Sequence, residues 1–161
     1  MARRNPIQVI MESELPDFSK RPRLYRPKLK DAKLYYKLLN RHIFQNQLTP
    51  TRIKLIGMRD CWGYCSNQGS AGDVHASEIH LARRFPCVQF FIAVVAHEMI
   101  HQYQWEIETP IRRNRGLRPC WGHGDSFFRW KNKFKKLGIP LSRYGNHIKL
   151  KEHQDIWAMS R

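Results

Sequence analysis

Two histidines and a glutamate lie close together in His97-Glu98-Met99-Ile100-His101, within the most apolar part of the chain. In an α-helix, residues four positions apart lie on one face, one turn above the other, so His97 and His101 can both direct ring nitrogens at one metal ion. Glu98 is one residue further round the helix and can reach a water on that ion without being a ligand. The HExxH spacing therefore predicts a metal site, typically zinc, with a glutamate as general base.

A histidine inside an apolar helix is often an ordinary core residue that finds a hydrogen-bond partner nearby. Here three polar groups share little more than one helical turn, and their neighbours are Phe90, Phe91, Val94, Val95 and Ile100. Burying all three without partners costs several kcal/mol, whereas one metal ion satisfies them together. We therefore interpret the motif as a metal site rather than as part of the packing.

A catalytic zinc needs a third protein ligand and an open fourth position. The metzincin pattern would require a glycine and a histidine where this chain has Gln104 and Ile107. A glutamate on a following helix is also poorly supplied, because Glu106 and Glu108 end the same helix. The third ligand must therefore come from another part of the chain.

His123 is the next candidate ligand. It lies in Trp121-Gly122-His123-Gly124-Asp125-Ser126-Phe127-Phe128, at the start of the next predicted helix. The flanking glycines have no side chain that would keep the backbone away from an ion. Asp125 is the alternative ligand, although we favour Asp125 or Ser126 as the cap of that helix.

Three imidazoles beside a carboxylate predict the hydrolysis of peptide bonds. Zinc activates a water and polarises the scissile carbonyl, and Glu98 takes the water proton and passes it to the leaving amine. Three histidines with an open position favour zinc over other divalent metals. The candidates for stabilising the oxyanion are Tyr144 and His147.

The elements that must position these residues follow from the hydrophobic pattern. A helix is predicted from Asp31 to a point before Pro50, with apolar residues near helical spacing at Leu34, Leu38, Ile43 and Phe44. Strands are predicted over 51–58, 62–66 and 77–83. The segment 88–107 is apolar and predicts a buried helix that carries the HExxH motif.

The remaining segments are less regular. After the buried helix we expect a long loop that contains Pro110, Gly116 and Pro119, and then a helix from about residue 125 to Leu137. A short strand is predicted over 147–151. Residues 1–30 hold four prolines and many basic residues, and prolines at this density oppose both helix and central strand. We therefore expect a basic arm over 1–30 and one domain over 31–161.

Charge gives a prediction about partners. The chain has 161 residues, and 29 Lys and Arg outweigh 13 Asp and Glu to give a net charge of +16. Such a surplus attracts polyanions, of which nucleic acid is the commonest. No apolar run reaches the ~20 residues of a membrane span, and Glu12 and Glu14 interrupt the only stretch that resembles a secretory signal. We expect an intracellular protein that associates with nucleic acid and not with a membrane.

The four cysteines are expected to be free thiols in a reducing compartment. They are Cys61, Cys65, Cys87 and Cys120. A structural zinc held by all four is an alternative, although no close Cys-x-x-Cys pair is present.

In combination these residues resemble the SprT-like family of metalloproteases, which includes Spartan. The matching stretches follow the family's order and cover about residues 31–141. They are Cys61-Trp62-Gly63-Tyr64-Cys65-Ser66, Ile79-His80-Leu81, Ala96-His97-Glu98-Met99-Ile100-His101, and Gly122-His123-Gly124 with Phe127 or Phe128. HExxH alone is moderately specific, and its combination with the Gly-His-Gly and Cys-x-Gly-x-Cys stretches is much more so.

The resemblance implies an α+β fold of the small zincin type, with a short sheet packed against the HExxH helix. It implies one catalytic zinc ion held by His97, His101 and His123, with Glu98 as the catalytic residue. Cys61 and Cys65 match a structural motif of the family. The best-known members cleave proteins crosslinked to DNA, and only when bound to DNA. We therefore expect a monomeric zinc metalloendopeptidase whose partners are DNA and a protein substrate.

Two basic clusters flank His123 and are the candidate nucleic-acid contacts. The first is Arg112, Arg113, Arg115 and Arg118, and the second is Arg129, Lys131, Lys133, Lys135 and Lys136. Trp62, Tyr64 or Trp121 could stack on bases. Bacterial members often carry a carboxy-terminal zinc ribbon, whereas no cysteine follows Cys120 in this sequence, and the segment 107–120 is longer than usual. DNA contact is therefore expected from the domain and the arm.

Two other functions fit the same residues. One is a basic nucleic-acid-binding protein that keeps zinc for structure and does not cleave. The other is a protease for a single substrate in which the positive charge serves solubility.

Overall fold

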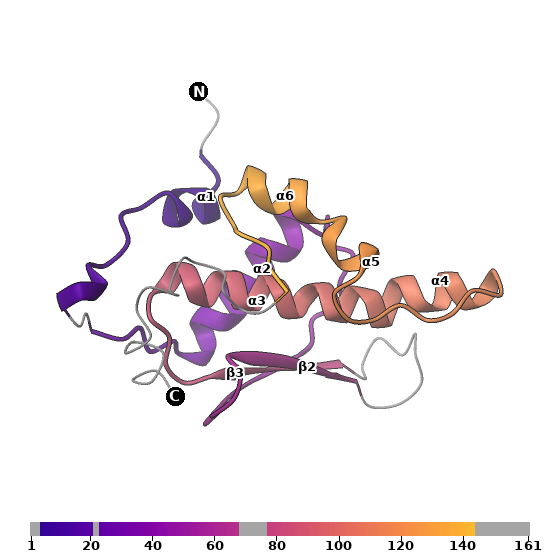
Figure 1. The fold of residues 1–161 in the computed structure, drawn as a ribbon, viewed down its shortest axis with the longest axis horizontal. Coiled ribbons are helices and arrows are strands. Elements are labelled where there is room, and N and C mark those ends of the chain that lie inside the picture. The colour runs from indigo at the N-terminus through magenta and orange to yellow at the C-terminus, as the bar shows by residue number, and fades with distance from the viewer. Residues whose placement is uncertain (1–3, 21–22, 68–76, 144–161) are drawn as a thin grey trace.

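The computed structural model describes residues 4–20, 23–67 and 77–143, which form an α+β fold (Figure 1). A small sheet lies against one long helix, and shorter helices cover the other side of that helix. The elements are α1 (Pro6–Met11), the 3₁₀ turn η1 (Phe18–Lys20), α2 (Leu29–His42), β1 (Arg52–Ile56), β2 (Gly63–Asn67), β3 (Ser77–Ala82), α3 (Val88–Tyr103), the π turn η2 (Gln104–Glu108), α4 (Thr109–Asn114), α5 (Asp125–Phe128) and α6 (Lys131–Lys136). The predicted fold class is confirmed.

The three predicted strands form one mixed sheet in the order β1-β3-β2. β3 is parallel to β1 and antiparallel to β2, with Ile79 opposite both Ile53 and Cys65. Side chains alternate between the two faces of a strand, and Ile79 and Leu81 are fully buried. Because β3 is the central strand, β2 is an edge strand in the described part of the sheet.

α3 is the central helix of the core. Thirteen of its sixteen residues are buried, because the sheet packs on one side while α2 and α1 pack elsewhere on its surface. A helix that is buried all round has no solvent-facing polar stripe. This agrees with the apolar pattern that predicted α3.

The end of the predicted helix is wrong, since the chain does not enter a loop at Ile107. The N–H of Thr109 donates to the carbonyl of Gln104, five residues back, which makes η2 a π turn. Helix α4 follows directly and continues to Asn114, with Pro110 in its first turn. Proline has no N–H with which to continue the helical hydrogen bonds, and the π turn directly before Pro110 accommodates this break.

α2 is confirmed, and Ile43 and Phe44 just after it are fully buried as predicted, but the buried face of α2 itself differs from the predicted one. The buried residues are Ala32, Tyr36, Leu39 and Asn40, whereas Leu34 is 53% exposed. The prediction included neither Tyr36 nor Asn40. Tyr36 and Asn40 can face the core because the Tyr36 hydroxyl bonds Gln102 and Asn40 exchanges two hydrogen bonds with Leu48.

The expectation that residues 1–30 form no core element is also wrong. The Asn5 side chain caps α1 by accepting from the N–H of Ile7, and Pro6 occupies the first helical position. The prediction treats the prolines as helix breakers, but at the first helical position a proline favours a helix. Ile7 is fully buried in the core. The division at residue 30 stays a prediction.

The predicted helix 125–137 is two helices, α5 and α6, that meet at Arg129 and Trp130. The Trp130 ring is buried against Phe44 and Tyr103, with ring centroids 4.6 and 4.8 Å apart. Gly138 ends α6 with a positive φ of 72°. The predicted strand 147–151, with Tyr144 and His147, lies outside the described residues. In the described part of the chain, no helix is long and apolar enough to cross a membrane.

Candidate metal centre and active-site cleft

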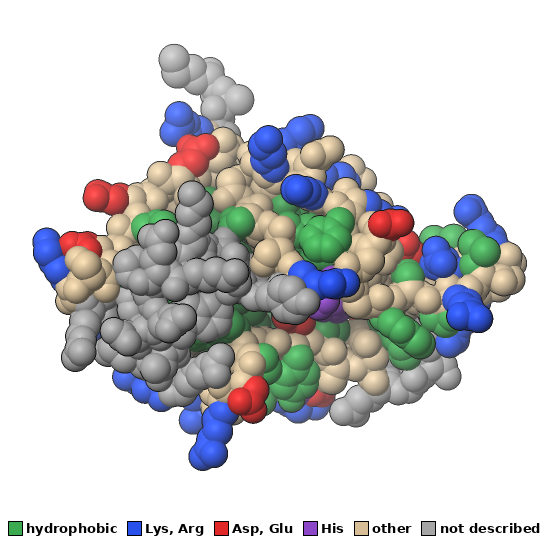
Figure 2. Space-filling model, in the orientation of Figure 1, with side chains coloured by type: hydrophobic (Ala, Val, Ile, Leu, Met, Phe, Trp, Pro, Cys, Tyr) green, Lys and Arg blue, Asp and Glu red, His purple; other side chains and the backbone are tan. Residues whose placement is uncertain are grey.

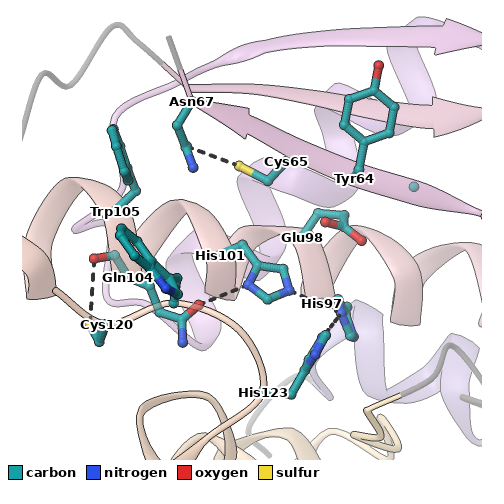
Figure 3. A pocket seen from close by; sticks show the side chains of 12 residues that line it. Tyr64, Cys65, Asn67, His97, Glu98, His101, Gln104, Trp105, Cys120 and His123 are labelled. Carbon is teal, nitrogen blue, oxygen red and sulfur yellow. Dashed lines mark hydrogen bonds between the residues drawn. The ribbon is translucent and has the colours of Figure 1, made fainter. Parts of the chain in front are cut away.

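The three predicted histidine ligands come together in the structure (Figure 3). His97 and His101 lie one turn apart on α3, and His123 lies in the segment that leads into α5. Nε2 of His97 is 3.3 Å from Nε2 of His101 and 3.0 Å from Nε2 of His123. One nitrogen from each ring falls within a group whose members are all within 4.8 Å of one another.

This donor set fits a tetrahedral zinc ion. Zinc–nitrogen bonds of about 2.0–2.1 Å in tetrahedral geometry place the nitrogens about 3.3 Å apart. Burial is the main cause that lowers the pKa of both His101 and His123, and this favours the neutral rings that metals require. Asp125, the alternative ligand, is exposed and is not part of the group.

Phe127 forms a wall behind the cluster. Its ring is fully buried, and its centroid lies 4.7, 5.2 and 4.7 Å from those of His97, His101 and His123. Phe127 lies in α5, four residues after His123. The N-cap of α5 is Gly124 with no side-chain cap bond, so the predicted capping role of Asp125 or Ser126 is wrong. The chain turns into this segment at Gly122, where φ is 74°.

Gln104 is a part of the site that sequence reasoning missed. Its side chain is buried and lies 2.9 Å from Nδ1 of His101. It also donates to the carbonyl of Gly122 and to the hydroxyl of Ser126. Its position seven residues after His97, on the same helical face, is the signal that could have found it.

Glu98 points from α3 toward the strand β2 and lines a cleft (Figure 3). The residue is 6% exposed. Burial raises the pKa of Glu98 to about 8, while the backbone N–H of Cys65 acts in the opposite direction. The cleft has a volume of about 370 Å³ and also contains His97, His101, His123 and Trp121.

Close packing of β2 on α3 closes one side of the cleft. A Cβ at Gly63 would lie 2.9 Å from Cγ1 of Val94, so only glycine allows this approach. Trp62 is buried between Phe85 and Phe90, which makes its predicted role in base stacking wrong. In the Cys-x-Gly-x-Cys stretch, Trp62 and Gly63 therefore contribute packing, and Cys65 lines the cleft.

The cysteines do not form the alternative zinc site. None of the four is in a disulfide, and Cys61 is exposed whereas Cys87 and Cys120 are buried. Over residues 4–20, 23–67 and 77–143, the three histidines are the one group of metal-binding side chains close enough to share an ion.

The first basic cluster lies on α4 and the loop after it, which project from the body of the molecule (Figures 1 and 2). Arg113, Arg115 and Arg118 are exposed, and Arg112 donates from Nε to the carbonyl of Arg118. Trp121, between this loop and His123, is 66% exposed.

The second cluster divides into two kinds of residue. Lys131, Lys135 and Lys136 on α6 are exposed, and Lys and Arg side chains gather over α6 in Figure 2. Arg129 and Lys133 are also exposed, but they lie over the Trp130 ring, with distances of 5.3 and 4.8 Å to its centroid. These two side chains are therefore partly engaged in packing.

Comparison with known proteins gives one finding of similarity. The model of the SprT-like family matches residues 32–151, which include the sheet, the three histidines and Glu98. No curated protein matches the chain. Because the match covers most of the sequence, the chain belongs to the SprT-like family, and it contains the metallopeptidase-like, zinc-associated domain of that family.

Proposed function

We propose that this protein is a zinc-dependent metalloendopeptidase that acts on DNA-bound or DNA-crosslinked proteins. His97, His101 and His123 would hold the zinc ion, and Glu98 would be the general base. The observation that carries the proposal is the convergence of three imidazole nitrogens beside a buried carboxylate in one open cleft. Membership of the SprT-like family supports the same chemistry.

A bound zinc ion would supply an activated water and polarise the carbonyl of the peptide bond. Glu98 would accept a proton from that water and return it to the leaving amine. Its buried setting supports this role, because burial increases the proton affinity of a carboxylate. The N–H of Cys65 would keep the carboxylate directed into the cleft.

The cleft also suits a polypeptide as substrate. β2 borders it as an edge strand of the described sheet. An edge strand presents unpaired N–H and C=O groups, which can pair with an extended peptide. Such pairing would place a peptide bond of the substrate between β2 and the histidine cluster.

Association with DNA is supported by charge and by the exposed aromatic side chain next to the site. The net charge of +16 favours phosphate contacts. Arg113, Arg115 and Arg118 lie exposed on the projecting segment, and Trp121 offers a face for stacking a base. Lys131 and Lys135 would add phosphate contacts from α6. The protein would act as a monomer inside the cell.

The proposal is tested by incubating the protein with a basic DNA-binding protein substrate, with and without single-stranded DNA. We expect cleavage in the presence of DNA, and a loss of about 10²–10⁴-fold in Glu98→Gln because a general base is removed. Glu106→Gln is the matched control, since Glu106 is also buried on the same helical rod but lies outside the cleft.

Two results would contradict parts of the proposal. Equal cleavage without DNA would remove the dependence on DNA. Full zinc occupancy without cleavage by the wild-type protein would instead favour a nucleic-acid-binding protein with a structural zinc.

A further inference from the structure

The amide of Gln104 lies next to the histidine cluster and is 1% exposed (Figure 3). Gln104 begins the π turn η2, immediately after α3. With His97 and His101 it follows the spacing i, i+4, i+7, which keeps all three on one helical face. It is therefore the next side chain along the face that carries two of the proposed ligands.

The hydrogen bonds of Gln104 determine which way its amide points. Nε2 lies 3.0 Å from the carbonyl oxygen of Gly122, which can only accept, so this atom must be the amide nitrogen. Oε1 then faces Nδ1 of His101 at 2.9 Å. Because a carbonyl oxygen accepts only, Nδ1 of His101 must carry the proton. The other nitrogen, Nε2, is left with its lone pair directed at His97.

The same amide also holds the segment that carries His123. Its nitrogen donates to the Gly122 carbonyl on one side of His123 and to the Ser126 hydroxyl on the other, at 3.0 and 2.6 Å. One buried side chain thus connects the end of α3 to both flanks of the third histidine. In this arrangement, Nε2 of His123 lies 3.0 Å from Nε2 of His97.

We propose that Gln104 is a positioning residue of the metal centre, which sets the tautomer of His101 and holds His123 in register with the two helical histidines. This inference rests on the proposed metal site. Residues that orient metal ligands through their second nitrogen change affinity by about 10–100-fold when they are replaced. A glutamine that only packed in the core would have no such effect on the folded protein.

The first test is the zinc affinity of the folded protein, measured by competition with a chelator. Gln104→Leu is expected to weaken zinc binding by about 10–100-fold. Gln104→Glu keeps an acceptor for His101 and is expected to bind more tightly than the leucine variant. Gln102→Leu is the matched control, because Gln102 is a buried amide on the same helix that bonds Thr49, Tyr36 and Glu106 instead. It is expected to lower stability without changing zinc affinity.

The second test needs no metal. In the metal-free wild-type protein, NMR correlation of the ring nitrogens should show His101 protonated on Nδ1, and Gln104→Leu should lose this preference. Unchanged zinc affinity and unchanged tautomer in Gln104→Leu would overturn the inference, as would an equal loss of affinity in Gln102→Leu. If the tautomer changes as expected but the wild-type chain takes up no zinc, the proposed function fails while the role of Gln104 toward His101 stands.

Discussion

Replacing Gly63 by alanine would place a methyl group in the tightest contact between β2 and α3. The new Cβ would lie 2.9 Å from Cγ1 of Val94, 3.1 Å from the carbonyl oxygen of His80 and 3.2 Å from Cδ2 of Leu81. Val94 and Leu81 are buried, and His80 contributes backbone, so none of these atoms can move away freely. Overpacking of this kind costs about 1–3 kcal/mol.

The assay is denaturant unfolding of the wild type, Gly63→Ala, Val94→Ala and the double variant. Val94→Ala removes the closest atom, so the penalty of Gly63→Ala should be smaller in that background, with a coupling of about 0.5–3 kcal/mol. Gly57→Ala is the control, because a Cβ there meets nothing within 4 Å. The close-packing argument is refuted if Gly63→Ala costs no more than Gly57→Ala, or if the two changes add without coupling.

A loss of activity larger than the loss of folded protein should accompany Gly63→Ala. β2 carries the N–H of Cys65 that faces Glu98, so a displaced strand leaves the carboxylate less well directed. The measurement is kcat under conditions in which both variants are fully folded. Equal kcat values for the wild type and Gly63→Ala would show that the packing of β2 does not affect the catalytic step.

Three further predictions concern the histidine cluster. Phe127→Ala should lower the free energy of unfolding by about 3–5 kcal/mol and also weaken zinc binding. Phe134 is equally buried but touches no histidine in the cluster, so Phe134→Ala should cost a similar amount of stability and leave zinc affinity unchanged. Gly122→Ala should cost about 1–2 kcal/mol because φ is 74°, and Gly124→Ala, without a positive φ, should cost less; equal denaturation midpoints would contradict this. Zinc at 1,000 times its dissociation constant should stabilise the wild type by about 4 kcal/mol, and a chelator titration followed by thermal unfolding should show no such gain in His123→Ala.

The sequence predicts best where one local pattern decides the structure. Alternating residues located three strands, and an apolar run located α3, because neither depends on distant contacts. His97 and His101 could be paired from spacing alone, since the helix geometry fixes their relation. His123 required a further argument from its glycine neighbours and from the resemblance to a family.

The features that were missed depend on partners far away in the sequence. The hydrophobic pattern predicts Leu34 as a core residue. Tyr36 and Asn40 face the core instead, because both find hydrogen-bond partners there. The π turn at residues 104–108 allows α3 to continue through Pro110, and no local pattern indicated it. In the sequence, Gln104 stands out only as a mismatch to the metzincin pattern. Its contacts with Gly122 and Ser126 exist only in the folded chain.

The most direct test of the account is X-ray absorption at the zinc edge of the purified protein, combined with metal analysis of the wild type and His123→Ala. The account predicts one zinc per wild-type chain, bound by three imidazole nitrogens and one oxygen ligand, and a loss of most of that zinc in His123→Ala. A wild-type protein without zinc, zinc bound through sulfur, or full occupancy in His123→Ala would contradict it.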